Sequence, residues 1–245
     1  MTTYETIQGE VTEDGIGILT LNRPEKRNAI SIRMRQEISR CLREWGDSEQ
    51  VGAVILTGAG SVFSAGFDLS EFGEPSRFDE LFDSSSRYHR EVWSFPKPLI
   101  AAINGPSMGG GFDLATLCDL RICIPSASFG HPEIKFGAPP LFTPLRWIVG
   151  DGVARDLVLT GRPIGAEDAF RIGLITRIVA ADQLMGEALR IAKVILEAPP
   201  ETLKFVKTYL ASSAGRDFEE SFRVEHDQPF QEILLPLARK GLKRK

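Results

Sequence analysis

The first quarter of the chain alternates between strand and helix patterns. Residues 4–11 and 16–21 carry the apolar alternation of two strands, and Asp14–Gly15 lies in the turn between them, so we expect a β-hairpin. Ser31 then has the side chain and the position of a helix N-cap, and the apolar residues that follow recur at helical spacing to about Trp45.

Two continuous apolar runs open into glycine-rich turns. The first is AVILTG at 53–58, and the second is PLIAAI at 98–103, which a helical pattern follows from residue 112. A helical stretch at 77–93 separates the two runs, and RICI at 121–124 is a further strand candidate. Apolar strands that alternate with helices predict an α/β core of largely parallel strands, buried on both faces.

From about residue 143 onwards the pattern becomes helical. The predicted helices cover 152–160, 166–172, 182–197, 200–213 and 217–234. We divide the chain into an α/β core over 1–190 and a helical C-terminal region over 191–245. A region this short buries too little apolar surface alone, so we expect it to pack on the core and on neighbouring subunits.

Composition and charge exclude several classes of protein. The 245 residues are 42% hydrophobic and 25% charged, which is typical of a folded globular protein. The net charge of −4 argues against a nucleic-acid binder. A basic run at 239–245 is either a solvated tail or an aid to binding an anionic substrate.

Targeting and cysteine patterns lead us to expect a cytoplasmic protein. The N-terminus has no signal-peptide pattern, and no apolar stretch is long enough to cross a membrane. The three cysteines are too few and too irregularly spaced for a disulfide framework or a metal site: Cys41, Cys118 and Cys123. We therefore expect reduced, packed cysteines and no metal.

The two glycine-rich turns are candidate binding elements. Gly66 and the triplet 109–111 allow close approach of a ligand, and their backbone N–H groups can point at a partially negative oxygen. The second turn also begins a helix, whose N-terminus favours negative charge. The alternative is that each turn only connects a strand to a helix. Neither turn has a phosphate-loop or dinucleotide motif, which leaves an ATPase or a nicotinamide enzyme without support.

Two carboxylates follow these turns. Asp113 and Glu133 are 20 residues apart and can converge across a helix–strand–turn unit, as a general acid and a general base must. Alternatively, Asp113 complements the helix dipole and Glu133 is a solvated loop charge. His131, two residues before Glu133, is interpreted as a packing or supporting residue rather than a catalytic one.

Three blocks of sequence together resemble the crotonase (enoyl-CoA hydratase/isomerase) superfamily. They are FSAGFDL at 63–69, PLIAAINGPSMGGGFDLATLCDLRI at 98–122 and ASFGHPEIKFG at 127–137, and NRPEKRNAIS and LVLTGRPIGAEDAFRIGLITRIV extend the match. The resemblance implies a spiral of repeated ββα units with a helical C-terminal trimerisation region. It also implies an acyl-CoA thioester substrate, no separate cofactor, and a homotrimer or a dimer of trimers.

The resemblance also assigns residues. The oxyanion-hole donors fall on the N–H groups of Phe67 and Gly110, and the acid/base pair falls on Asp113 and Glu133. The carbonyl of Ala65 would face the adenine, with Lys26 or Arg23 near the nucleotide phosphates. The remaining substrate-binding positions lie beside the two turns and in the acyl pocket: Asp68, Gly109, Pro140 and Leu141.

Two departures from the family pattern bear on the reaction. Asp113 stands where hydratases have Glu, and the Asp/Glu pairing resembles the dienoyl-CoA isomerase branch. That branch has a further Asp eight residues after the Glu, where this chain has Leu141. Residues 139–145, PPLFTPL, replace the glycine-rich turn of many hydratases, so the acyl group stays open.

The expected activity is addition of water to a 2-enoyl-CoA thioester. The alternatives are an enoyl- or dienoyl-CoA isomerase, another acyl-CoA reaction of the superfamily, or a non-catalytic binding protein of the same fold. Neither a nucleic acid nor a membrane is expected as a partner.

Overall fold

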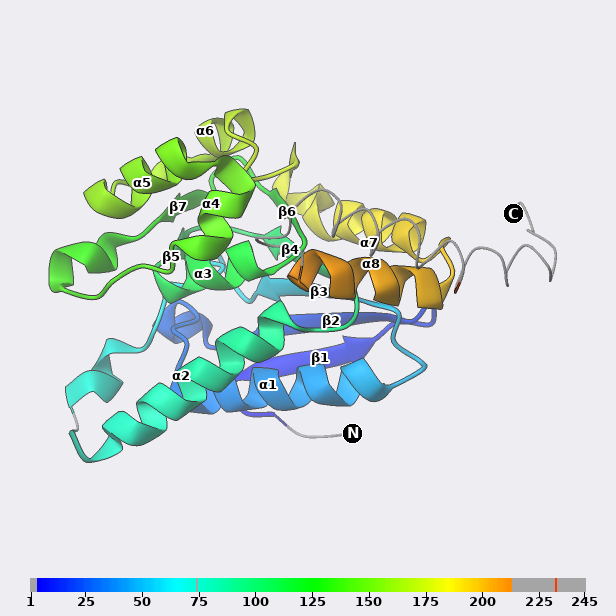
Figure 1. Ribbon diagram of the computed structural model, residues 1–245, viewed down its shortest axis with the longest axis horizontal. Helices are drawn as coiled ribbons and strands as arrows, with labels where there is room; N and C mark the ends of the chain where they lie inside the picture. Colours follow the sequence, from blue (N-terminus) through cyan, green and yellow to red (C-terminus); the bar gives the residue numbers. More distant parts are fainter. Residues whose placement is uncertain (1–3, 74, 213–231, 233–245) are drawn as a thin grey trace.

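The computed structural model describes residues 4–73, 75–212 and 232, and its centre is a six-stranded sheet (Figure 1). The strand order is β1-β2-β3-β4-β6-β9. Only β1 runs antiparallel to its neighbour, which confirms a largely parallel sheet. The strands are β1 (Ile7–Val11), β2 (Ile16–Leu21), β3 (Ala53–Gly58), β4 (Leu99–Ile103), β6 (Leu120–Cys123) and β9 (Arg177–Ile178).

A second sheet has three very short strands. β5 (Ser107–Met108) pairs with β7 (Ser128–Gly130), and β7 pairs with β8 (Ile164–Gly165). The sequence analysis did not predict this sheet, because strands of two or three residues are too short to show a periodic pattern. The sheet matters for the site, since β5 leads directly into the triple glycine and β7 into His131.

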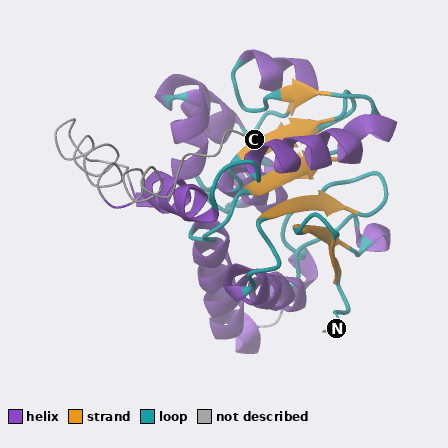
Figure 2. Cartoon of the chain, turned by 90° about the vertical axis from the view of Figure 1, so that its right-hand side faces the viewer, coloured by secondary structure: helices purple, strands orange, loops and turns teal. Residues whose placement is uncertain are grey.

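Helices connect and cover the strands (Figure 2). Every helix predicted within the described residues is present, together with the unpredicted α4. The helices are α1 (Ile32–Asp47), α2 (Phe78–Trp93), α3 (Gly110–Leu117), α4 (Thr143–Val149), α5 (Asp151–Thr160), α6 (Ala166–Arg171), α7 (Leu184–Ile195) and α8 (Pro200–Ser212). Short 3₁₀ turns lie at η1 (Pro24–Lys26), η2 (Leu69–Gly73), η3 (Pro75–Arg77), η4 (Pro132–Phe136) and η5 (Ala181–Gln183).

The core lies between the sheet and its helices. All residues of β3 and β4 are buried, as expected for strands covered on both faces. Ser31 caps α1 by accepting a hydrogen bond from the N–H of Met34, as its position predicted. The Trp45 ring of α1 lies so close to β2 that a Cβ atom at Gly17 would be 2.8 Å away. None of the described helices is long and apolar enough to cross a membrane.

The C-terminal helices are joined to the core as far as they are described. The predicted boundary at residue 190 falls within α7, which packs on β3, β4 and β6. On α8, Lys207 forms an ion pair of 2.6 Å with Asp119, and the other carboxylate oxygen of Asp119 accepts the N–H of Leu99 on β4. The rest of the predicted C-terminal region, including most of the helix at 217–234, lies outside the described residues.

Candidate active site

A single cavity of about 970 Å³ brings together the predicted site residues, with the exception of Arg23. Its walls come from η1, the two glycine-rich turns, α2 and the segment 132–141. The predicted residues that line it are Lys26, Ala65, Phe67, Asp68, Gly109, Gly110, Asp113, Glu133, Pro140 and Leu141.

Local hydrogen bonds shape the first turn so that one N–H remains available. Gly66 has φ +96°, and its carbonyl accepts the N–H of Ile30 at 2.8 Å. The N–H of Asp68 donates to the carbonyl of Ile30 at 3.2 Å. Phe67 lies between these two bonds, and its N–H donates to no hydrogen-bond acceptor among the described residues.

The second turn abuts the first. The N–H of Gly109 donates to the carbonyl of Gly130 at 2.9 Å, and Gly110 then begins α3, so its N–H is at the helix N-terminus. A Cβ atom at Gly66 would lie 3.2 Å from the Gly110 nitrogen and 2.8 Å from the Met108 carbonyl oxygen. Phe67 and Gly110, the two residues with an available N–H group, therefore belong to turns in direct contact.

The two predicted carboxylates meet around a buried histidine. Asp113, in the first turn of α3, is 8% exposed, and His131 is fully buried. His131 Nδ1 lies 2.8 Å from Glu133 Oε1 and 3.8 Å from Asp113 Oδ1. Asp113 Oδ1 and Glu133 Oε2 are buried and have no hydrogen-bond partner among the described residues. Each carboxylate therefore keeps an oxygen that can bind or exchange a proton.

Burial changes the proton affinity of Asp113. It raises the pKa of this carboxyl to about 7, with the charge of Glu133 adding to the rise and His131 and the N–H of Leu141 opposing it. Asp113 therefore keeps its proton to a higher pH than an ordinary aspartate, which is ionised at neutral pH.

Several cavity residues were missed by the sequence analysis. His89, Ser85, Ser86 and Arg90 line the cavity from α2. His89 Nδ1 lies 2.8 Å from the carbonyl oxygen of Ser85, and its ring contacts that of Phe67, with centroids 5.9 Å apart. Because a carbonyl only accepts, this nitrogen carries the proton. The one available signal was the helical spacing of residues 85, 86, 89 and 90, which places them on one face.

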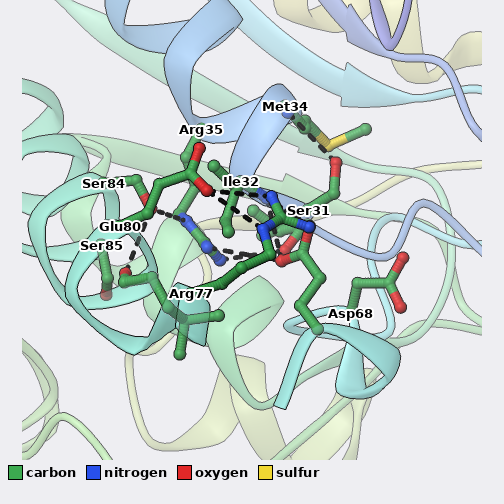
Figure 3. Close-up of polar contacts among 12 residues, drawn as sticks. Ser31, Ile32, Met34, Arg35, Asp68, Arg77, Glu80, Ser84 and Ser85 are labelled. Carbon is green, nitrogen blue, oxygen red and sulfur yellow. Dashed lines mark hydrogen bonds and ion pairs between the residues drawn. The ribbon is translucent and has the colours of Figure 1, made fainter. Parts of the chain in front are cut away.

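Arg35 contacts the first glycine-rich turn, and no sequence pattern indicated this contact. It is fully buried on α1, and its guanidinium lies over the Phe67 ring, 4.6 Å from the centroid. It donates to the carbonyl of Ile30 and to Ser84 Oγ on α2, both at 3.1 Å (Figure 3). Arg35 thus holds the first turn between α1 and α2.

The predicted nucleotide-binding positions have different environments. Lys26 lines the cavity, but Arg23 does not; it forms an ion pair of 2.9 Å with Asp68. Burial opposes ionisation of Asp68, but hydrogen bonds from Ser70 and Arg23 outweigh it and lower the pKa of Asp68. Within the described part of the chain, no group of three or more His, Cys, Asp or Glu side chains could hold a metal ion.

Comparison with known proteins agrees with this geometry. The enoyl-CoA hydratase/isomerase family model matches residues 11–239. A probable enoyl-CoA hydratase of Mycobacterium tuberculosis is 36% identical, over 89% of this chain and 84% of the relative. A short-chain-enoyl-CoA hydratase of Clostridium acetobutylicum is 34% identical, over 88% of this chain and 85% of the relative.

A solved structure supports the same assignment. The crystal structure of enoyl-CoA hydratase from Bacillus anthracis superposes with a TM-score of 0.89 at 28% identity, covering 96% of each chain. The fold is therefore the α/β crotonase fold, as the sequence blocks predicted. This chain is an enzyme of the enoyl-CoA hydratase/isomerase family.

Proposed function

We propose that the protein is an enoyl-CoA hydratase, which adds water across the double bond of a 2-enoyl-CoA thioester. The observation that carries this proposal is the juxtaposition, in one cavity, of two available N–H groups and two carboxylates that each have a free oxygen. Coenzyme A is then part of the substrate, and the reaction needs no other cofactor.

The N–H groups of Phe67 and Gly110 would bind the thioester oxygen. This oxygen gains negative charge as water adds to the double bond, so donors already in place stabilise the transition state more than the ground state. The N-terminus of α3 adds positive potential at the same point. One such donor typically contributes a factor of about 10²–10³ in rate.

The carboxylates would divide the proton transfers. Glu133 removes a proton from water as the water oxygen bonds to the β-carbon, and Asp113 in its protonated form delivers a proton to the α-carbon. The raised pKa of Asp113, due mainly to burial, supports its assignment as the acid. Lys26 and the carbonyl of Ala65 would contact the nucleotide, and Pro140 and Leu141 the acyl group.

A double-bond isomerase is the second candidate. It is favoured by the Asp/Glu composition of the pair, in which either carboxylate has an unpartnered oxygen that could carry a proton between carbon atoms. Leu141 lines the cavity at the position of the third carboxylate of the dienoyl-CoA isomerase branch, and this apolar residue favours the hydratase.

Substrate profiling separates the two functions. Purified protein is incubated with 2-enoyl-CoA thioesters of increasing chain length and, separately, with 3-enoyl-CoA thioesters. The hydratase proposal predicts loss of the conjugated enoyl absorbance and formation of 3-hydroxyacyl-CoA, which Glu133→Gln abolishes. Conversion of 3-enoyl to 2-enoyl thioesters, with no hydration of any 2-enoyl substrate, would instead establish the isomerase.

A further inference from the structure

His131 occupies the centre of the carboxylate pair. It follows β7 directly, and its fully buried ring packs on that of Phe112 of α3, with centroids 4.7 Å apart and the ring planes tilted by 33°. Its Nδ1 faces both carboxylates, at 2.8 Å from Glu133 and 3.8 Å from Asp113. Only the first distance is that of a hydrogen bond.

The direction of this hydrogen bond follows from its acceptor. An ionised carboxylate only accepts, so Nδ1 carries the proton and donates it to Glu133 Oε1. The other ring nitrogen, Nε2, is buried and makes no hydrogen bond within the described residues. All the hydrogen bonding of the ring is therefore directed to one oxygen of Glu133.

This bond fixes which oxygen of Glu133 faces the substrate. With Oε1 bound to His131, Oε2 lies against the second glycine-rich turn, where a Cβ atom at Gly109 would be 3.1 Å from it. Gly109 directly precedes the proposed oxyanion donor Gly110. The geometry points to His131 as a positioning residue, whose Nδ1–H holds the carboxylate of Glu133 so that Oε2 is directed at the reacting atoms. This inference rests on the proposed acid/base role of Glu133.

The titratable groups that face the ring are Glu133 on η4 and Asp113 on α3. The buried hydroxyl of Tyr88 on α2 interacts electrostatically with Asp113. A hydrogen bond to a carboxylate favours its ionised form. Loss of the His131 donor should therefore change the dependence of kcat/KM on pH.

Three substitutions separate positioning from packing. In His131→Asn the side-chain amide can occupy the place of Nδ1, in His131→Gln it extends toward the place of Nε2, and in His131→Leu no donor remains. We expect His131→Leu to lower kcat about 10- to 100-fold, as small misplacements of a catalytic group do, with KM changed less than about twofold. His131→Asn should recover most of the activity and the normal pH profile, and His131→Gln should not.

The Asn/Gln comparison keeps the inference testable even if the leucine variant does not fold. Equal kcat values and equal pH profiles for His131→Asn and His131→Gln would overturn it. A crystal structure of His131→Gln gives a readout independent of activity, in which Glu133 should be rotated away from Gly109; an unrotated Glu133 would also overturn the inference. Failure of the wild-type enzyme to hydrate any 2-enoyl-CoA would instead overturn the proposed function.

Discussion

At the residue scale, the acid/base pair is the part of the molecule most sensitive to substitution. Glu133→Gln and Asp113→Asn each remove one proton carrier with little change in volume, so each should lower kcat by about 10²–10⁴. Because the two residues act as a unit, the double variant should lose far less than the product of the single losses. Steady-state kinetics with each variant, with acyl-CoA affinity as the control for binding, measures this. Near wild-type activity of Asp113→Asn would leave Glu133 as the only proton carrier and favour a single-base isomerase.

The protonation of Asp113 predicts the pH dependence of the reaction. An acid must be protonated to donate, and the pKa of this residue is raised to about 7 chiefly by burial. We therefore expect kcat/KM, which reports the pKa of the free enzyme, to fall as the pH rises through about 7, and the residual activity of Asp113→Asn to lack this alkaline limb. A wild-type profile that is flat between about pH 6 and pH 9 would contradict the role of Asp113 as the acid.

The same shift predicts that the stability, like the activity, falls as the pH rises. Between pH 3.8 and about 7 the folded protein keeps a proton on Asp113 that the unfolded chain has released, so the free energy of unfolding falls as the pH rises. Asp113→Asn removes this titration. The Tm of this variant minus the Tm of the wild type should therefore increase by a few degrees between pH 4 and pH 8, as measured by calorimetry. A constant difference in Tm between the two proteins over this range would show that burial does not destabilise the ionised form of the Asp113 carboxyl.

At the scale of elements, the contact between the two glycine-rich turns has no room for a side chain. A Cβ atom at Gly110 would lie 2.6 Å from the Phe67 ring. The Arg35 guanidinium packs over the face of this ring and holds it in place. Gly110→Ala should therefore displace the two N–H donors relative to each other and lower kcat about 10²–10³-fold.

A matched glycine on a distant helix controls for this prediction. Gly186 lies in α7, and apart from the local helix backbone no atom of the described residues is within 4 Å of its Cβ position, so Gly186→Ala should leave kcat unchanged. The contradicting result would be equal activity of Gly110→Ala and Gly186→Ala in the same assay.

Sequence patterns predicted the elements that have regular periodicity. The continuous apolar runs became β3 and β4, and Ser31 began α1, because these signals are local to the chain. The short strands β5, β7 and β8 carry no such signal, although β7 is what brings His131 against α3.

The predicted site residues came mainly from the family resemblance, and their convergence depends on tertiary structure. Spacing alone left open whether Asp113 and Glu133 meet, and the structure places them 3.8 Å and 2.8 Å from the same atom, His131 Nδ1. The contacts of Arg35 and His89 with the Phe67 ring join residues far apart in the sequence, so no local pattern could indicate them.

At the scale of the whole molecule, we predict a homotrimer or a dimer of trimers. On α7 and α8, apolar side chains remain exposed on the isolated chain: Val194 is 53%, Val206 45% and Leu210 54% exposed. Exposed apolar side chains on neighbouring helices favour association. Sedimentation should give a mass three or six times the 27.0 kDa of the chain, and a stable monomer at micromolar concentration would contradict the prediction.

Truncation tests the contribution of the C-terminal helices to this assembly. Ending the chain after Pro199 removes α8 and the Lys207–Asp119 ion pair, which leaves Asp119 without its buried cation. We expect loss of assembly together with loss of solubility, measured by size-exclusion chromatography. A truncated protein that stays soluble and keeps the mass of the full-length assembly would show that residues 200–245 are not needed for it.

The central claim is that Glu133 and Asp113, beside the N–H groups of Phe67 and Gly110, add water to an enoyl thioester. Its most direct test is turnover of a panel of 2-enoyl-CoA thioesters in ¹⁸O-labelled water, with mass spectrometry of the products. The wild-type enzyme should form a 3-hydroxyacyl-CoA with one ¹⁸O atom, and Glu133→Gln should form it at a rate lower by about 10²–10⁴. No labelled hydroxyacyl product from any thioester, or equal labelling rates for both proteins, would contradict it.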